Sequence, residues 1–251
     1  MKIGIVCYPT FGGSGVVATE LGKALADNGH QYTLSPITNL PDWISSRKTF
    51  FYHEVSVSKY PLFDYPPYEL ALASRMVDVV RFEKLDILHV HYAIPHASAA
   101  FMAKQILQTY GIYIPVVTTL HGTDITLVGK DRTYKPVVTF SINMSDGVTA
   151  VSENLRKDTF EFFEIENDIR VIPNFIDLHR FNLQAKDHFK RAIAPEGEKI
   201  LIHTSNFRKV KRTEDVVRIF AKILEKIPSK LLMVGDGGER SDCEQLCRDR
   251  A

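Results

Sequence analysis

Short apolar runs and amphipathic stretches alternate along the first 174 residues of the chain. The apolar runs have the length of buried strands, whereas the stretches between them repeat apolar residues at the spacing of one helix face. This alternation predicts an α/β protein in which helices cover both faces of a parallel sheet. The predicted strands are residues 3–7, 86–91, 114–120, 147–151 and 169–174, and the predicted helices are residues 17–29, 68–82, 95–110 and 135–144.

A second cycle of the same kind follows a polar stretch that carries little strand signal. We expect an N-terminal domain at residues 1–176, and a linker with a second domain at residues 177–251. Two strands cannot form a sheet that buries both faces of its helices, so we expect this second domain to be incomplete and the chain to be a fragment. The elements predicted in it are a strand at residues 199–204, a helix from about Thr213 and a strand at residues 230–234.

The composition is that of an ordinary globular protein. Hydrophobic residues make up 45% of the 251 positions, and 31 basic residues balance 30 acidic ones to a net charge of +1. This balance favours neither a nucleic-acid partner nor a membrane surface, and no apolar run is long enough to insert into a membrane. Three cysteines form no even disulfide set, and the chain begins with a strand rather than a signal peptide, so we expect a cytoplasmic protein. The composition leaves a homo-oligomer open.

Polar or glycine-rich turns follow several of the predicted strands. Residues 10–15 hold three glycines, residues 118–124 place His121 just beyond an apolar run, and residues 205–212 carry four cations. In an open α/β sheet, ligands bind outside the carboxyl ends of the strands. We therefore expect these turns to face one crevice, which we interpret as a site for a phosphorylated sugar donor.

Six segments, in this order, resemble the retaining glycosyltransferases of family 4, and most closely the branch that acts in bacillithiol biosynthesis. The resemblance covers nearly the whole chain, apart from residues 35–47. It implies an α/β fold of the GT-B type with two Rossmann-like domains. It also implies transfer of N-acetylglucosamine from UDP-GlcNAc to the hydroxyl of L-malate, without a cofactor or a metal. The segments are CYPTFGGSG at residues 7–15, YPPY at 65–68, HVHYAIPH at 89–96, TTLHGTD at 118–124, NFI at 174–176 and SNFR at 205–208.

The resemblance also implies which residues act on the substrates. His121 would lie beside the donor sugar, and Tyr92 and Thr118 would bind one carboxylate of the acceptor. Gly13 and Ser14 would border the donor diphosphate and the acceptor. The predicted catalytic residues are His121, Arg208 and Lys211, and the predicted substrate-binding residues are Gly13, Ser14, Tyr92, Thr118, Asp124 and Asn206.

Two of these predictions rest on charge. Arg208 and Lys211 would stabilise the negative charge that a departing nucleoside diphosphate gathers. Asp124 would either fix the ring of His121 or cap the next helix, and the sequence favours neither. No carboxylate nucleophile stands out, which favours front-face displacement, in which the leaving phosphate helps to deprotonate the acceptor.

Other features limit the interpretation. His89 and His91 would project from the same face of a strand, but no cysteine or carboxylate nearby completes a metal site. At the position of Thr139, the resembled family would have a basic residue that contacts the acceptor. Its acidic E-x7-E segment, which holds the donor, lies beyond the region present here, so we do not expect the 251-residue chain alone to catalyse transfer.

The sequence bears differently on three alternative functions. A nicotinamide-dependent oxidoreductase would need a G-x-G-x-x-G turn and an acidic residue closing the second strand, and the sequence has neither. Another family-4 glycosyltransferase with a different small acceptor stays open. So does a non-catalytic binder of sugar nucleotides, because the same turns would serve it.

Overall fold

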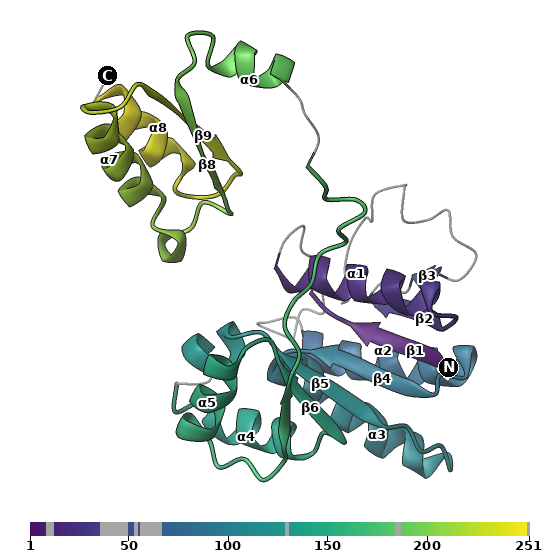
Figure 1. The fold of residues 1–251 in the computed structure, drawn as a ribbon. Coiled ribbons are helices and arrows are strands. Elements are labelled where there is room, and N and C mark those ends of the chain that lie inside the picture. The colour runs from purple at the N-terminus through teal and green to yellow at the C-terminus, as the bar shows by residue number, and fades with distance from the viewer. Residues whose placement is uncertain are drawn as a thin grey trace. The chain divides into compact units, whose positions relative to one another are not determined.

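The structure is a computed structural model that describes residues 1–8, 13–35, 50–52, 55, 67–128, 131–183 and 187–249. Residues 10–12 of the glycine-rich turn and residues 65–66 of the YPPY segment lie outside this range. The chain divides into two compact units, residues 1–176 and residues 177–251, which are described separately (Figure 1). None of the described helices has the length and apolar character needed to cross a membrane.

A parallel sheet forms the centre of the first unit, as the alternating pattern predicted, and it has seven strands where five were predicted. The strand order is β3-β2-β1-β4-β5-β6-β7, so the sheet grows in opposite directions from β1 and β4. The neighbouring strands β1 and β4 therefore flank the switch point, where open α/β sheets bind their ligands. The strands are β1 (Lys2–Val6), β2 (Gln31–Ser35), β3 (Phe50–Tyr52), β4 (Ile87–His91), β5 (Val116–Leu120), β6 (Gly147–Ala150) and β7 (Ile169–Val171).

Helices lie on both faces of this sheet (Figure 1). Apolar side chains of α2 and α3 pack on one face, and those of α1 pack on the other. The first contact includes Leu72, Met76, Val90, Ala100 and Val116, and the second includes Ile3, Ile5 and Ala18. The helices are α1 (Ser14–Asp27), α2 (Tyr68–Glu83), α3 (Ser98–Thr109), α4 (Lys135–Asn143) and α5 (Glu153–Phe162), and two short helical segments are η1 (Ala93–Ala97) and η2 (Thr123–Val128).

Local chemistry explains some of these boundaries. The helix α5, which the apolar pattern did not predict, begins after Ser152, whose hydroxyl accepts a hydrogen bond from the N–H of Leu155 at 3.2 Å. The strands β2 and β3 were also not predicted. The strand β7 ends at Val171, three residues earlier than expected, and Pro173 beyond it has no N–H to offer a neighbouring strand.

One face of the sheet carries a row of polar side chains, which we call the polar row: His89, His91, Thr119, His121 and Thr149. A strand buried on both faces is usually apolar throughout. Here the hydroxyl of Thr119 lies 2.7 Å from Nε2 of His89 and 2.7 Å from the hydroxyl of Thr149. Polar side chains of three neighbouring strands, His89, Thr119 and Thr149, are therefore linked by hydrogen bonds across this face.

The second unit contains a two-stranded parallel sheet. Its strands are β8 (Lys199–Thr204) and β9 (Ser229–Val234), which pair in register along their whole length. The helix α6 (Asp187–Ile193) lies in the stretch that was expected to be a linker and that carries little strand signal. The other elements are η3 (Lys209–Lys211), α7 (Thr213–Leu224) and α8 (Arg240–Arg248).

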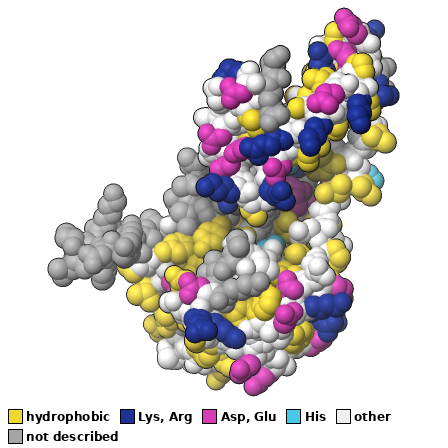
Figure 2. Space-filling view, turned by 90° about the vertical axis from the view of Figure 1, so that its left-hand side faces the viewer, with side chains coloured by type: hydrophobic (Ala, Val, Ile, Leu, Met, Phe, Trp, Pro, Cys, Tyr) yellow, Lys and Arg dark blue, Asp and Glu magenta, His cyan; other side chains and the backbone are white. Residues whose placement is uncertain are grey.

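Basic and acidic side chains are interspersed on the visible surface (Figure 2). This distribution agrees with the nearly neutral sequence, which has 31 basic and 30 acidic residues. Any strongly positive site must therefore be local, as in the loop after β8 that is described below.

Candidate functional site

Three rings gather at the carboxyl ends of β1, β4 and β5. Tyr8 follows β1, Tyr92 follows β4 and His121 follows β5. The ring centroids of Tyr8 and Tyr92 are 5.6 Å apart, and those of Tyr92 and His121 are 5.1 Å apart. The structure thus brings two of the predicted site residues, Tyr92 and His121, together at the switch point. It adds Tyr8, which no prediction included although it follows the first strand directly.

The backbone of Tyr92 is strained. Its φ of 83° and ψ of 140° lie in a region that side chains other than glycine rarely adopt. Such a conformation costs on the order of 1–3 kcal/mol and is concentrated at functional sites. The N–H of Tyr92 donates to the carbonyl of Thr119 at 2.9 Å, which ties this turn to β5. The surrounding structure therefore holds the Tyr92 ring in place although the backbone conformation of Tyr92 is unfavourable.

Asp124 links the turn after β4 to the turn after β5. Its side chain is buried, and one carboxylate oxygen accepts the N–H of Ala93 at 3.0 Å while the other accepts the N–H of Gly122 at 3.1 Å. Burial raises the pKa of the Asp124 carboxyl, and these backbone hydrogen bonds oppose the rise. Asp124 therefore holds the backbone of both turns, and among the described residues it forms no hydrogen bond to the ring of His121.

His121 is held by a second histidine. Its Nε2 lies 2.7 Å from Nδ1 of His91, and the two rings are stacked with centroids 5.0 Å apart. His91 stacks in turn on His89, at 4.9 Å, so the prediction that His89 and His91 share a face is confirmed. Burial and, to a smaller extent, the nearby His89 together lower the pKa of His121 to about 4. His121 is therefore a neutral imidazole at pH 7.

Thr118 does not join this group. Successive side chains of a strand point to opposite faces, so Thr118 points away from Thr119 and His121. Its side chain is fully buried, and its hydroxyl lies 2.7 Å from the hydroxyl of Ser145. In this structure the Thr118 hydroxyl is thus engaged in a hydrogen bond inside the first unit, and its acceptor contact stays a prediction.

Gly13 and Ser14 lie where α1 begins, after β1. Gly13 has φ 56° and ψ −129°, a conformation that favours glycine, and its carbonyl accepts the N–H of Val17 at 3.2 Å. Ser14 is buried as the first residue of the helix. Both residues therefore lie at the same edge of the sheet as Tyr92 and His121. The N-terminus of a helix at this edge stabilises a negative group.

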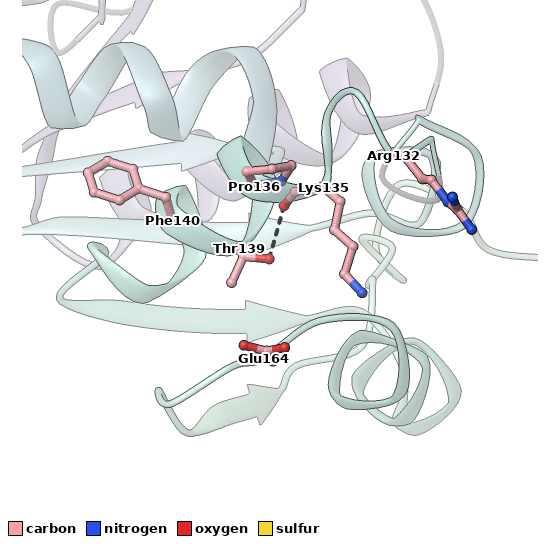
Figure 3. Close-up of a pocket in the computed structure, with 6 residues that line it drawn as sticks. All are labelled: Arg132, Lys135, Pro136, Thr139, Phe140 and Glu164. Carbon is pink, nitrogen blue, oxygen red and sulfur yellow. Dashed lines mark hydrogen bonds between the residues drawn. The ribbon is translucent and has the colours of Figure 1, made fainter.

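The first unit also has a pocket of about 510 Å³ beside α4 (Figure 3). Lys135 and Thr139 project from α4 toward the side on which Glu164 lies. The Thr139 hydroxyl donates to the Lys135 carbonyl at 2.9 Å and is thus engaged with the helix backbone. Two cations, Arg132 and Lys135, line the pocket around this threonine.

In the second unit, the loop after β8 presents cations. Arg208 and Lys211 are exposed. Neither has an ion-pair partner among the described residues. Arg212 differs, because its Nε lies 2.6 Å from a carboxylate oxygen of Asp215. Asn206 is exposed in the same loop, and its carbonyl accepts the N–H of Arg208 at 2.9 Å. Arg208 and Lys211 are therefore available to an anion, whereas Arg212 is engaged within the protein.

The loop after β9 supports this cationic loop through its backbone. The N–H of Phe207 donates to the carbonyl of Asp236 at 2.9 Å, and the N–H of Glu239 donates to the carbonyl of Phe207 at 3.0 Å. Phe207 itself is buried. A Cβ atom added to Gly235 would lie 1.8 Å from the carbonyl oxygen of Ser205, so only glycine allows the two loops to approach this closely.

We expect Gly235→Ala to displace the cationic loop and to destabilise the second unit. The φ of Gly235 is 143°, so alanine there adds about 1–3 kcal/mol of backbone strain to the steric clash. Urea unfolding of the variant should give a lower free energy of unfolding than the parent chain. The matched control is Gly238→Ala, since a Cβ atom at Gly238 meets nothing within 4 Å. Equal stability of the two variants would contradict the role given to Gly235.

Comparisons with known proteins agree with this arrangement. Residues 11–180 match the profile of Glycosyltransferase Family 4. The chain is 49% identical over 251 residues to a protein of Bacillus anthracis named N-acetyl-alpha-D-glucosaminyl L-malate synthase, and the match covers 99% of the chain. It spans 65% of the length of that relative.

Two solved structures share the fold. One is a sucrose-phosphate synthase of Thermosynechococcus elongatus, with a TM-score of 0.73 and 19% identity over 99% of this chain and 67% of the other. The second is HepE of Anabaena in complex with UDP and glucose, with a TM-score of 0.73 and 15% identity over 100% of this chain and 65% of the other. The likeness shows the predicted α/β fold of the GT-B type.

Proposed function

Because the chain belongs to glycosyltransferase family 4, we propose that the enzyme transfers N-acetylglucosamine from UDP-GlcNAc to the hydroxyl of L-malate, with retention at the anomeric carbon. The observation that carries this proposal is the 49% identity to the Bacillus anthracis protein, which extends over 99% of the chain. The substrates are taken from the name of that relative.

The acceptor would bind at the carboxyl ends of β1, β4 and β5. Malate offers two carboxylates and one hydroxyl. The Tyr92 hydroxyl and the N-terminus of α1 at Ser14 are polar groups at this edge that suit such a molecule. The ring of His121 would lie beside the donor sugar. Thr118 is left out of this proposal, because its hydroxyl is buried against Ser145.

The donor diphosphate would bind at the loop after β8. Arg208 offers a planar fork of N–H donors and Lys211 a compact charge, and both suit phosphate oxygens. Their charge would matter most when UDP leaves, because negative charge then gathers on the phosphate. Asn206 in the same loop would contribute an amide that can donate and accept hydrogen bonds.

Front-face displacement is the mechanism that suits this group of residues. A covalent glycosyl-enzyme would need a free carboxylate at the acceptor edge. Asp124 is the carboxylate closest in sequence to His121, and both of its oxygens accept backbone N–H groups. In the proposed step, the bond from the anomeric carbon to the UDP oxygen breaks while the malate oxygen bonds to that carbon on the same face. The hydroxyl proton passes to the leaving phosphate.

The direct test is UDP release by the enzyme at the full length of its relatives, with UDP-GlcNAc and a panel of acceptors. We expect turnover with L-malate and none with neutral sugar alcohols. Turnover with another small acid but not with malate would favour a family-4 enzyme of different acceptor specificity. Binding of UDP-GlcNAc without any turnover would favour a non-catalytic binder.

We expect Tyr92→Phe to raise the KM for malate while UDP-GlcNAc binding changes little. The substitution removes one hydroxyl and keeps the ring. A hydrogen bond to a charged group contributes roughly 1.5–3 kcal/mol, which corresponds to a rise in KM of about 10–150-fold. Steady-state kinetics with each substrate varied in turn would measure it. Tyr110→Phe, on the exposed end of α3, is the matched control. Unchanged malate kinetics in Tyr92→Phe would remove Tyr92 from the acceptor site.

We further propose that the enzyme works in the cytoplasm. The three cysteines, Cys7, Cys243 and Cys247, are all free thiols. Free thiols persist in reducing compartments, whereas oxidising compartments favour disulfides. Fractionation of cells that contain the enzyme would test this proposal.

A further inference from the structure

His91 occupies an unusual position in the polar row. Its ring is fully buried, and it stacks on His89 on one side and on His121 on the other. Its Nδ1 lies 2.7 Å from Nε2 of His121, within hydrogen-bond distance. Its other nitrogen, Nε2, is buried and has no hydrogen-bond partner among the described residues. This combination decides where the protons of both rings lie.

A neutral imidazole has one N–H and one bare nitrogen. If Nδ1 of His91 accepted the hydrogen bond, the proton of His91 would sit on Nε2, as a buried donor without a partner. Buried donors without a partner are rarer in proteins than buried acceptors that lack one. The favoured arrangement therefore has Nδ1–H of His91 donating to Nε2 of His121. His121 then carries its own proton on Nδ1.

We propose that His91 is a positioning residue that fixes His121 in the tautomer with its proton on Nδ1, so that His121 offers an N–H donor to the substrates. The tautomer is a property of this chain alone, whereas its role in catalysis rests on the proposed function. In this tautomer His121 binds a ligand oxygen, such as a sugar hydroxyl or a carboxylate. Its Nδ1 cannot act as a general base.

The surrounding groups agree with neutral rings. Burial lowers the pKa of His91 well below its ordinary value, and it lowers the pKa of His89, His96 and His121 to about 4. Asp124, the carboxylate closest in sequence to His121, accepts backbone N–H groups and forms a hydrogen bond to neither ring. The proton of the acceptor hydroxyl is therefore left to the departing phosphate, which is what front-face displacement requires.

The first test is NMR of the chain with ¹⁵N-labelled histidine at pH 7. We expect the ring of His121 to show a protonated Nδ1 and a bare Nε2. In His91→Leu, which cannot donate, the proton of His121 should move partly or wholly to Nε2. His89→Gln is the control in the same row, because His89 stacks on His91 but has no hydrogen bond to His121. A protonated Nε2 on His121 in the parent chain would overturn the proposal, whether or not the enzyme turns over.

The second test is kinetic and needs no substitution at His91. The amide N–H of asparagine can lie near the position of Nδ1, whereas a carboxylate in that position only accepts. His121→Asn should therefore retain more kcat than His121→Asp. The difference should approach about 10²–10³-fold, the effect of one preorganised donor. A higher kcat in His121→Asp would mean that His121 acts as an acceptor or base, which would also overturn the proposal. Absence of turnover in the parent enzyme would instead contradict the proposed function.

Discussion

Replacing Arg208 with alanine is expected to lower kcat for transfer by about 10²–10³-fold, the effect of removing one preorganised group that stabilises developing charge. Arg208 is exposed in the loop after β8 and has no ion-pair partner in the described part of the chain. Its guanidinium is therefore free to pair with the departing diphosphate. Lys211→Ala should act in the same direction, because its ammonium group is equally free.

The KM for UDP-GlcNAc should change much less than kcat, since the charge is greatest in the transition state. The measurement is UDP release under steady state, in the enzyme at the full length of its relatives. Arg212→Ala is the matched control, because Arg212 is already paired with Asp215 at 2.6 Å. We expect its kcat to stay within about twofold of the parent value, as for ordinary surface substitutions. A rise in KM with unchanged kcat in Arg208→Ala would mean that Arg208 binds only the ground state.

The first unit is expected to lose much of its stability between pH 6.5 and pH 4. The pKa of His89, His96 and His121 is about 4 in the folded chain, and that of His91 is well below its ordinary value, chiefly because burial disfavours the charged ring. An unfolded histidine has a pKa of about 6.5, so the unfolded chain binds protons first as the pH falls. The stabilisation is therefore fully present above pH 6.5 and is lost toward pH 4.

The loss is at most about 1.4 kcal/mol per pH unit for each histidine. At pH 5 the four rings together would account for between about 2 and 8 kcal/mol, a large part of the stability of a typical domain. Asp124 acts in the opposite direction, because burial raises its pKa. Urea unfolding at pH 7 and at pH 5 would measure the loss.

Substitution of one buried ring provides the control for this prediction. His89→Gln should reduce the difference between pH 7 and pH 5 by up to about 2 kcal/mol, the share of a single histidine. The same change at His179, which is exposed in the second unit, should leave the difference as it was. Equal unfolding free energies at pH 7 and pH 5 in the parent chain would contradict the neutral state assigned to the polar row.

The sequence by itself determined the parallel sheet, because short apolar runs and helix-spaced stretches report local burial directly. It also indicated that the turns at residues 10–15, 118–124 and 205–212 follow strands, and therefore that they lie at carboxyl ends. The resemblance to family 4 rested on six short segments, three of which overlap these turns. Each of these inferences depends on residues that are near one another in the chain.

Only the tertiary structure decided which side chains meet. His91 and His121 are 30 positions apart, and they form a hydrogen bond because the register of β4 and β5 pairs His91 with Thr119, two positions before His121. Thr118 is the neighbour of Thr119 in β5, so its side chain points to the opposite face of the sheet, where its hydroxyl lies against that of Ser145. Likewise, Asp215 of the following helix engages Arg212 and leaves Arg208 free. Contacts of this kind depend on strand register and on neighbouring elements, which the spacing of residues within one segment does not encode.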